Sequence, residues 1–199
     1  INPIPAACQA IVAGHTRRID TAIANGRPML LLAGFGFEAG MIEHATRDLK
    51  NRYGALAYLF GGWAQMADHE NFRARIEVDG QVQEVETGTV VVANAAPPTS
   101  VLAQGQGQPV LDDGLLDVTI VTGVETHWDA VDTMLRLFNA GLFGTEAGVN
   151  VLHLRGEKIR VETDPCQRIV LDGEMAEQGP MDFQCVPRSL TVFTPPPTR

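Results

Sequence analysis

Two-residue turn signals flanked by alternating apolar residues constrain this chain more than any other feature of its sequence. Asn25-Gly26 lies inside an alternating stretch from Arg17 to Gly34, and Asp79-Gly80 separates Phe72 to Val78 from Val82 to Thr87. Asn-Gly and Asp-Gly favour the type I′ turn, which joins adjacent antiparallel strands because both of its central residues take positive φ. Both stretches therefore predict β-hairpins.

Further short apolar segments, separated by polar or glycine turns, fill most of the remaining chain. Those expected to be strands are Thr89 to Ala93, Leu115 to Val121, Val149 to Leu154, Ile159 to Thr163, Arg168 to Leu171, Met181 to Val186 and Leu190 to Phe193. Helical periodicity is confined to Met41 to Lys50, Ala55 to His69 and a segment that begins at Thr126. This pattern predicts a β-rich α+β fold, mostly an antiparallel β-sandwich with two to three inserted helices, as a single domain over residues 1–199.

Charge and cysteine content narrow the function classes. Asp and Glu total 24 against 15 Lys and Arg, so the net charge is -9 and a nucleic-acid partner is disfavoured. The same sign opposes broad adhesion to anionic lipid, so a membrane substrate would be reached through a local patch. Cys8, Cys166 and Cys185 form no C-x-x-C pair and predict neither a disulfide framework nor a zinc site. We expect a soluble cytoplasmic protein, and the first residue, Ile1, indicates a piece of a longer chain.

A glycine motif raises one alternative function. Gly34 to Ala39 reads G-x-G-x-x-A after an apolar strand, which is the form of a dinucleotide-binding loop in an oxidoreductase. Such a loop needs a second parallel strand that ends in an acidic residue about 20 positions on. That place falls at Gly54 to Tyr58, inside a predicted helix, so a glycine turn between strand and helix is the better interpretation.

An acidic loop is the first candidate site. Asp112, Asp113 and Asp117 lie in Leu-Asp-Asp-Gly-Leu-Leu-Asp, where two carboxylates and a backbone carbonyl are able to offer oxygen ligands to a hard cation such as Mg²⁺. The alternative is a hairpin turn at Asp113-Gly114 with solvated acids around it. Spacing alone leaves both interpretations open and favours the turn.

The second candidate is an acidic turn at a strand end. Asp172-Gly173-Glu174 follows the apolar Ile169 to Leu171, a position from which catalytic groups are often presented. Glu174 would serve there as a general base toward a hydroxyl group, provided that its surroundings tune its proton affinity. A turn that ends the strand explains the same residues equally well.

Taken in order, these segments resemble the C-terminal domain of the diacylglycerol kinase and sphingosine kinase family, which includes the bacterial lipid kinases. The resemblance covers nearly the whole chain and involves five segments. They are Arg17 to Asp20, Ala33 to Ala39, Leu56 to Leu59, Leu111 to Val118 and Leu171 to Glu174, the last followed by a closing strand pair from Phe183 to Leu190.

The resemblance implies an ATP-dependent lipid kinase of two domains. Glu174 corresponds to the proposed base, and Asp112, the Leu115 carbonyl and Asp117 correspond to a Mg²⁺ site. ATP, the phosphate donor, is bound mainly by an N-terminal domain with a Gly-Gly-Asp-Gly-Thr loop that these 199 residues lack, so the fragment alone is expected to be inactive. The implied partners are that domain and a lipid substrate at the membrane surface, which the protein would contact peripherally in phospholipid biosynthesis. Assembly as a homodimer stays open.

One segment departs from the family pattern. After Val90 to Asn94 many relatives carry a glycine-rich loop, whereas this chain continues Ala95-Ala96-Pro97-Pro98-Thr99-Ser100. Because that loop helps to shape the cleft between the two domains, the departure supports a second hypothesis. In it the chain is a degenerate, non-catalytic domain that binds a lipid or a partner.

Overall fold

Left-handed residues close the hairpins that the sequence predicts. The computed structural model of the chain describes residues 4–36, 71–96, 110–122 and 151–195. Asn25 and Gly26 have φ angles of 45° and 80°, and Asp79 and Gly80 have φ angles of 48° and 86°. Positive φ at both central positions is the requirement of the type I′ turn, and Asn, Asp and Gly reach it at little cost. Both predicted hairpins form, but the second strand of the first hairpin ends at Met29, and Leu32 to Gly36 pairs with Thr89 to Ala93 instead.

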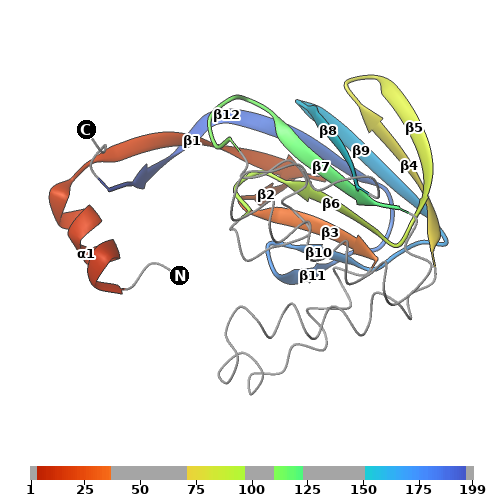
Figure 1. Cartoon of the computed structure of the whole chain (residues 1–199), viewed down its shortest axis with the longest axis horizontal. Helices are drawn as coiled ribbons and strands as arrows, with labels where there is room; N and C mark the ends of the chain where they lie inside the picture. The colour runs from red at the N-terminus through yellow and green to blue at the C-terminus, as the bar shows by residue number, and fades with distance from the viewer. Residues whose placement is uncertain (1–3, 37–70, 97–109, 123–150, 196–199) are drawn as a thin grey trace, which may run out of the picture.

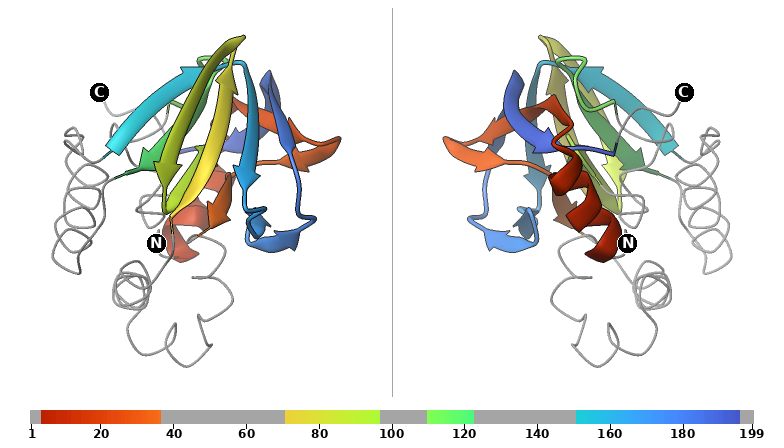
Figure 2. Two further views of the ribbon diagram at one scale, coloured as in Figure 1. Left: turned by 90° about the vertical axis from the view of Figure 1, so that its right-hand side faces the viewer. Right: turned by 90° about the vertical axis from the view of Figure 1, so that its left-hand side faces the viewer.

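The strands form two antiparallel sheets of six strands each. Sheet A has the order β2 (Arg27–Met29), β1 (Thr16–Ala24), β12 (Met181–Phe193), β9 (Lys158–Asp164), β4 (Phe72–Val78) and β5 (Gln81–Thr87). Sheet B has the order β11 (Glu174–Ala176), β10 (Ile169–Leu171), β3 (Leu32–Gly36), β6 (Thr89–Ala93), β7 (Leu116–Val121) and β8 (Val151–Gly156). Figures 1 and 2 show the two layers from three sides. The mostly antiparallel sandwich is therefore confirmed.

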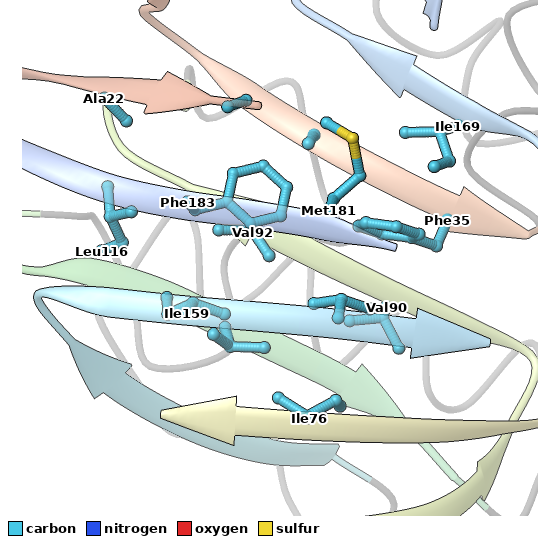
Figure 3. Close-up of a cluster of buried hydrophobic side chains, with 14 of the residues drawn as sticks. Ala22, Phe35, Ile76, Val90, Val92, Leu116, Ile159, Ile169, Met181 and Phe183 are labelled. Atoms are coloured by element: carbon cyan, nitrogen blue, oxygen red, sulfur yellow. The ribbon is translucent and has the colours of Figure 1, made fainter. Parts of the chain in front are cut away.

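The hydrophobic core lies between the sheets and takes alternate side chains from their strands. Phe35 of β3 and Phe183 of β12 meet edge to face across the layers, with ring centroids 6.2 Å apart. Figure 3 shows Ile76, Val90 and Leu116 in the same cluster, and all three are fully buried. Burial of each such side chain is worth about 1.5–3 kcal/mol relative to exposure. The sandwich is held chiefly by this cluster.

Sheet B differs from sheet A because its central strands are buried on both faces. Every residue of β3, β6 and β7 is buried, whereas β4 alternates between buried and more exposed positions. Three polar residues, Thr89, Asp117 and Thr119, occupy outward positions of β6 and β7 and are nevertheless at most 6% exposed. A buried polar group is costly unless it is hydrogen-bonded, so these positions call for a structural or functional reason.

The C-terminal strand corrects one prediction. The sequence predicts separate strands at Met181 to Val186 and Leu190 to Phe193, but β12 runs through both. Its pairing with β1 shifts register between Ile19 and Thr21, and Arg188 takes a positive φ of 49° beside this irregularity. A bulge thus absorbs the polar segment that the sequence analysis treats as a break.

Helix α1 (Ile4–Ala13) is absent from the predictions. In Figure 1 it stands apart from the sandwich at the end of a two-stranded ribbon, which is formed by the first residues of β1 and the last residues of β12. The predicted helices at Met41 to Lys50, at Ala55 to His69 and from Thr126 lie outside the described residues. Within the described ranges, no helix is long and apolar enough to cross a membrane.

Replacing Gly36 by Ala is expected to destabilise the sandwich by at least about 2 kcal/mol, through overpacking and a strained backbone. A Cβ atom there would lie 2.5 Å from Cε1 of Phe72 and 2.9 Å from the Gly88 carbonyl oxygen, at a φ of +74°. Urea unfolding of the purified protein measures the loss. Gly26→Ala is the matched control because its φ is +80° but no atom lies within 4 Å, so it should cost about 1 kcal/mol. Equal losses in the two variants would contradict the steric argument.

Cys185 should stay unreactive while the protein is folded. Burial, followed by the charges of Asp20, Asp113 and Glu157, raises the pKa of its thiol to about 11, whereas Cys8 and Cys166 are exposed. Since the thiolate is the reactive form, titration with a thiol reagent at pH 8 should count two fast thiols, and the third only after unfolding. Three fast thiols under native conditions would contradict this packing.

Candidate functional site

Glu174 is presented by a tight hairpin at one edge of sheet B. Strands β10 and β11 pair through Leu171 and Glu174, and the turn between them is Asp172-Gly173, with φ angles of 50° and 91°. The Glu174 side chain is exposed, and among the residues that the structure describes it has no hydrogen-bond or ion-pair partner. The turn interpretation is therefore right for the backbone, and it leaves the Glu174 carboxylate available.

Asp172 fixes the position of this hairpin. Its carboxylate accepts hydrogen bonds from three successive backbone N–H groups, those of Leu30 at 2.6 Å, Leu31 at 2.8 Å and Leu32 at 3.0 Å. The Asp172 N–H in turn donates to the Leu32 carbonyl at 2.9 Å. Hydrogen bonds to a charged group are worth about 1.5–3 kcal/mol each. The Glu174 hairpin is thus tied to the segment between β2 and β3.

Asp20 fixes the acidic loop in a similar way. It is fully buried, and its carboxylate accepts from the N–H groups of Gly114 at 2.7 Å and Arg188 at 2.6 Å. The Asp20 N–H donates to the Leu111 carbonyl at 2.7 Å. Asp20 therefore holds the loop that carries Asp112 and Asp113 against the bulge in β12.

Asp112 is engaged by an arginine of the ribbon. Arg17 donates to both of its oxygens, at 2.6 Å from Nη2 to Oδ1 and 3.1 Å from Nε to Oδ2. The hydrogen bond from Arg17 is the largest cause that lowers the pKa of Asp112, and the same bond raises the pKa of Arg17. Because both groups reach solvent, water screens the pair and its contribution to stability is small.

Asp117 lies at the start of β7 and is buried. Its Oδ1 atom accepts from Nε of Arg155 at 2.9 Å and lies 3.0 Å from Nε2 of His153. Arg155 also pairs with Asp113. The Oδ2 atom of Asp117 is buried without a hydrogen-bond partner, and so is the hydroxyl of Thr119 on the same face of β7.

The register of sheet B brings the two candidate sites to one end of the sheet. Asp117 of β7 lies opposite Ala93 of β6, which in turn lies opposite Leu32 of β3. The carbonyl of Leu32 accepts a hydrogen bond from the Asp172 N–H. At the usual spacing of about 4.8 Å between strands, three steps separate the Asp117 and Asp172 backbones by roughly 14 Å. No direct contact between Glu174 and the acidic loop is found in the described ranges.

The residues expected to bind a metal ion suit a bound cation only in part. The expected ligands are Asp112, Asp117 and the Leu115 carbonyl, and the unpartnered buried oxygen of Asp117 is the kind of group that a hard cation satisfies. Both oxygens of Asp112, in contrast, are held by Arg17, which would have to release one of them. No group of three or more Asp, Glu, His or Cys side chains suited to a metal occurs in the part of the chain that the structure describes. Of the two acidic side chains expected to bind a cation, Asp117 thus suits that role better than Asp112.

The glycine motif and one open groove of the sandwich lie away from these candidate residues. Gly34 and Gly36 are residues of β3, which pairs antiparallel with β6 and β10, so neither lies in a loop at a helix N-terminus beside a parallel strand. An open groove of about 570 Å³ is lined by residues of the Asn25 and Asp79 turns and of β9 and β12. Its lining includes none of the predicted site residues.

Four functional candidates, Asp20, Asn94, His153 and Arg155, are missing from the predictions. Asp20 and Asn94 carry a weak signal in the sequence, since each is a polar residue next to an apolar strand segment. In the structure each is at most 2% exposed. His153 and Arg155 carry none, because only the register of β8 against β7 brings them to Asp117.

Known proteins and one known family are similar to this chain in sequence. A sequence model of the family described as the YegS C-terminal NAD kinase beta sandwich-like domain matches residues 32–194. A protein of Synechocystis sp. named only as uncharacterized is 47% identical over 193 residues, which are 96% of this chain and 44% of that protein. A probable lipid kinase, YegS-like, from Pseudomonas aeruginosa is 30% identical over 195 residues, which are 96% of this chain and 61% of that protein.

Solved structures share the fold. A diacylglycerol kinase from Bacillus anthracis superposes with a TM-score of 0.71 at 24% identity, over 98% of this chain and 62% of that chain. The chain thus spans 44% of the Synechocystis protein and 61% of the Pseudomonas protein. Because the match to the family covers most of its length and the sandwich agrees with it, the chain belongs to the family of YegS C-terminal NAD kinase beta sandwich-like domains.

Proposed function

We propose that this chain is the C-terminal, substrate-side half of an ATP-dependent lipid kinase that phosphorylates a lipid hydroxyl. The observation that carries the proposal is the set of three hydrogen bonds to the Asp172 carboxylate, which fixes the hairpin that presents the exposed Glu174 side chain. The name of the Pseudomonas relative, a probable lipid kinase, supports the substrate class.

In the proposed reaction Glu174 is the general base. Its carboxylate accepts the proton of the lipid hydroxyl while that oxygen attacks the γ-phosphorus of ATP. The bond from the γ-phosphorus to the bridging oxygen breaks, and ADP leaves with the electron pair. The products are a phosphorylated lipid and ADP, and the proton on Glu174 returns to solvent.

Magnesium is proposed at the acidic loop, with Asp117, Asp112 and the Leu115 carbonyl as its ligands. When bound there it would neutralise the acidic side chains and order the domain. The chain's own residues already perform part of that task, because Arg17 and Arg155 neutralise Asp112 and Asp117.

The ATP site is assigned to an N-terminal domain of the same protein. Helix α1 supports this partner because it has no charged residue and exposes Ile4, Ile11 and Val12, at 80%, 55% and 88%. An uncharged, apolar helix that stands off the sandwich suits contact with another folded unit. A cytoplasmic protein that reaches its lipid peripherally at the membrane surface completes the proposal.

A second candidate function is a degenerate domain that binds lipid without catalysis. The ion pairs of Arg17 and Arg155 favour it, since they neutralise Asp112, Asp113 and Asp117 with the chain's own side chains. Binding of lipid vesicles by the intact protein, without consumption of ATP, would select this candidate over the kinase.

Replacing Glu174 by Gln in the full-length protein should lower kcat for lipid phosphorylation by about 100-fold or more, because a general base contributes that much. Transfer of labelled phosphate from ATP to diacylglycerol in mixed micelles measures the rate. Glu177→Gln is the matched control, because Glu177 is also exposed and lies three residues further on.

Equal rates for the wild type and Glu174→Gln would remove the base assignment. A second arm uses residues 1–199 alone, for which we expect no transfer because the chain has no phosphate-binding loop. Phosphorylation by this fragment would contradict the two-domain proposal.

Magnesium should raise the melting temperature of the full-length protein by several degrees, since at about 100 times its Kd a ligand stabilises the folded state by about 2.7 kcal/mol. Asp117→Asn should abolish the rise and Asp112→Asn should reduce it. Thermal unfolding with and without MgCl₂, in the absence of ATP, measures the difference. Asp182→Asn is the matched control because Asp182 also pairs with an arginine, Arg160, but on sheet A. An unchanged magnesium effect in Asp117→Asn would place the metal elsewhere.

A further inference from the structure

Asn94 occupies the junction between the two candidate sites. It follows β6 directly and is 2% exposed. Its carboxamide nitrogen donates one hydrogen bond to the Leu30 carbonyl at 2.8 Å and another to the Asp20 carbonyl at 3.0 Å. Its backbone N–H donates to the Leu31 carbonyl at 2.9 Å. One side chain therefore joins β1 of sheet A to the link that leads from β2 of sheet A to β3 of sheet B.

Each of these two segments ends at a candidate site. On one side, the N–H groups of Leu30 and its two successors bind the Asp172 carboxylate, which fixes the Glu174 hairpin. On the other side, the Asp20 carboxylate binds the Gly114 N–H, which fixes the acidic loop. The polar chain from Asp172 to Gly114 is thus continuous, and Asn94 is its middle member.

We propose that Asn94 is a positioning residue that couples the Glu174 hairpin to the acidic loop of Asp112 to Asp117. The inference deepens the proposed function and rests on it for the roles of the two ends. The coupling itself rests only on the hydrogen bonds, so it is testable without turnover.

The chemistry at this position selects asparagine. The amide group supplies two N–H donors from one atom. The two carbonyl oxygens that it bonds come from β1 and from the link between β2 and β3. An aspartate of the same shape would direct oxygens at those carbonyls, and alanine would leave both carbonyls without this partner. Buried carbonyls that lose a partner draw in water or move apart, so either change loosens both segments.

The test is hydrogen exchange of the full-length protein, read at the two ends of the polar chain. Asp172→Asn weakens one end near the surface, and we expect about tenfold faster exchange not only at Leu31 but also at the distant Gly114 amide. Asn94→Ala should accelerate both amides, and in the Asn94→Ala background Asp172→Asn should no longer affect Gly114.

Asp79→Asn is the matched control. Asp79 also has positive φ in a hairpin turn, and its carboxylate also accepts backbone N–H groups, those of Glu157 at 3.1 Å and Lys158 at 2.9 Å. Among the described residues, no chain of side-chain hydrogen bonds links Asp79 to Asn94. Its replacement should accelerate exchange at residues 157 and 158 and leave Leu31 and Gly114 unchanged.

Kinetic measurements distinguish a role of Asn94 in positioning the site from a role in stability alone. Asn94→Ala should lower kcat for lipid phosphorylation about tenfold with KM for ATP unchanged, while Asp79→Asn should change neither. Normal Gly114 exchange in Asp172→Asn would overturn the coupling even if Glu174 is the base. If Gly114 responds but Glu174→Gln keeps full activity, the coupling stands and the base assignment fails. If Asn94→Ala does not fold, Asp172→Asn alone decides.

Discussion

One interaction recurs at three hairpins of the described residues: the side chain of the first turn residue accepts a hydrogen bond from the backbone of a neighbouring strand. Asn25, Asp79 and Asp172 all have positive φ, and each is followed by glycine. Their side chains accept from the backbone of Asp182 in β12, Lys158 in β9 and Leu32 in β3. Asn and Asp suit this place because they tolerate left-handed φ and carry a short acceptor. Both edges of the sandwich depend on these contacts.

The candidate site uses the same interaction for a second purpose. At Asn25 and Asp79 the bond closes the scaffold, whereas at Asp172 it also fixes the residue two positions later, Glu174. Rigid presentation of a side chain from a turn on a packed frame is a common route by which a fold acquires chemistry. The contacts that present Glu174 are therefore contacts that also stabilise the sandwich.

The sequence predicts the local features of this fold well. The turn signals, the alternation along strands and the acidic residues can each be read from a few neighbouring positions. The hairpins and the antiparallel sandwich follow from these local signals. The continuity of β12 is not predictable in this way, because its polar middle is held by Asp20, 168 positions away. The ion pairs at the acidic loop escape prediction for the same reason, since Arg17 and Asp112 are 95 residues apart. Helix α1 is apolar on nearly all sides and uncharged, so it has neither the contrast between a polar and an apolar face nor the charge pattern that would have indicated it.

The ribbon beneath α1 has a mechanical consequence. Thr16 to Ile19 pair with Leu190 to Phe193, and the Thr194 N–H extends the ladder to the His15 carbonyl. The helix is therefore connected to the sandwich through two hydrogen-bonded strands, which bend out of their plane more easily than within it. Arg17 lies in this ribbon and donates a hydrogen bond to Asp112 of the acidic loop. The Arg17–Asp112 pair therefore ties the ribbon that carries α1 to the acidic loop, so a displacement of the ribbon would change how far the Asp112 oxygens are covered by an arginine.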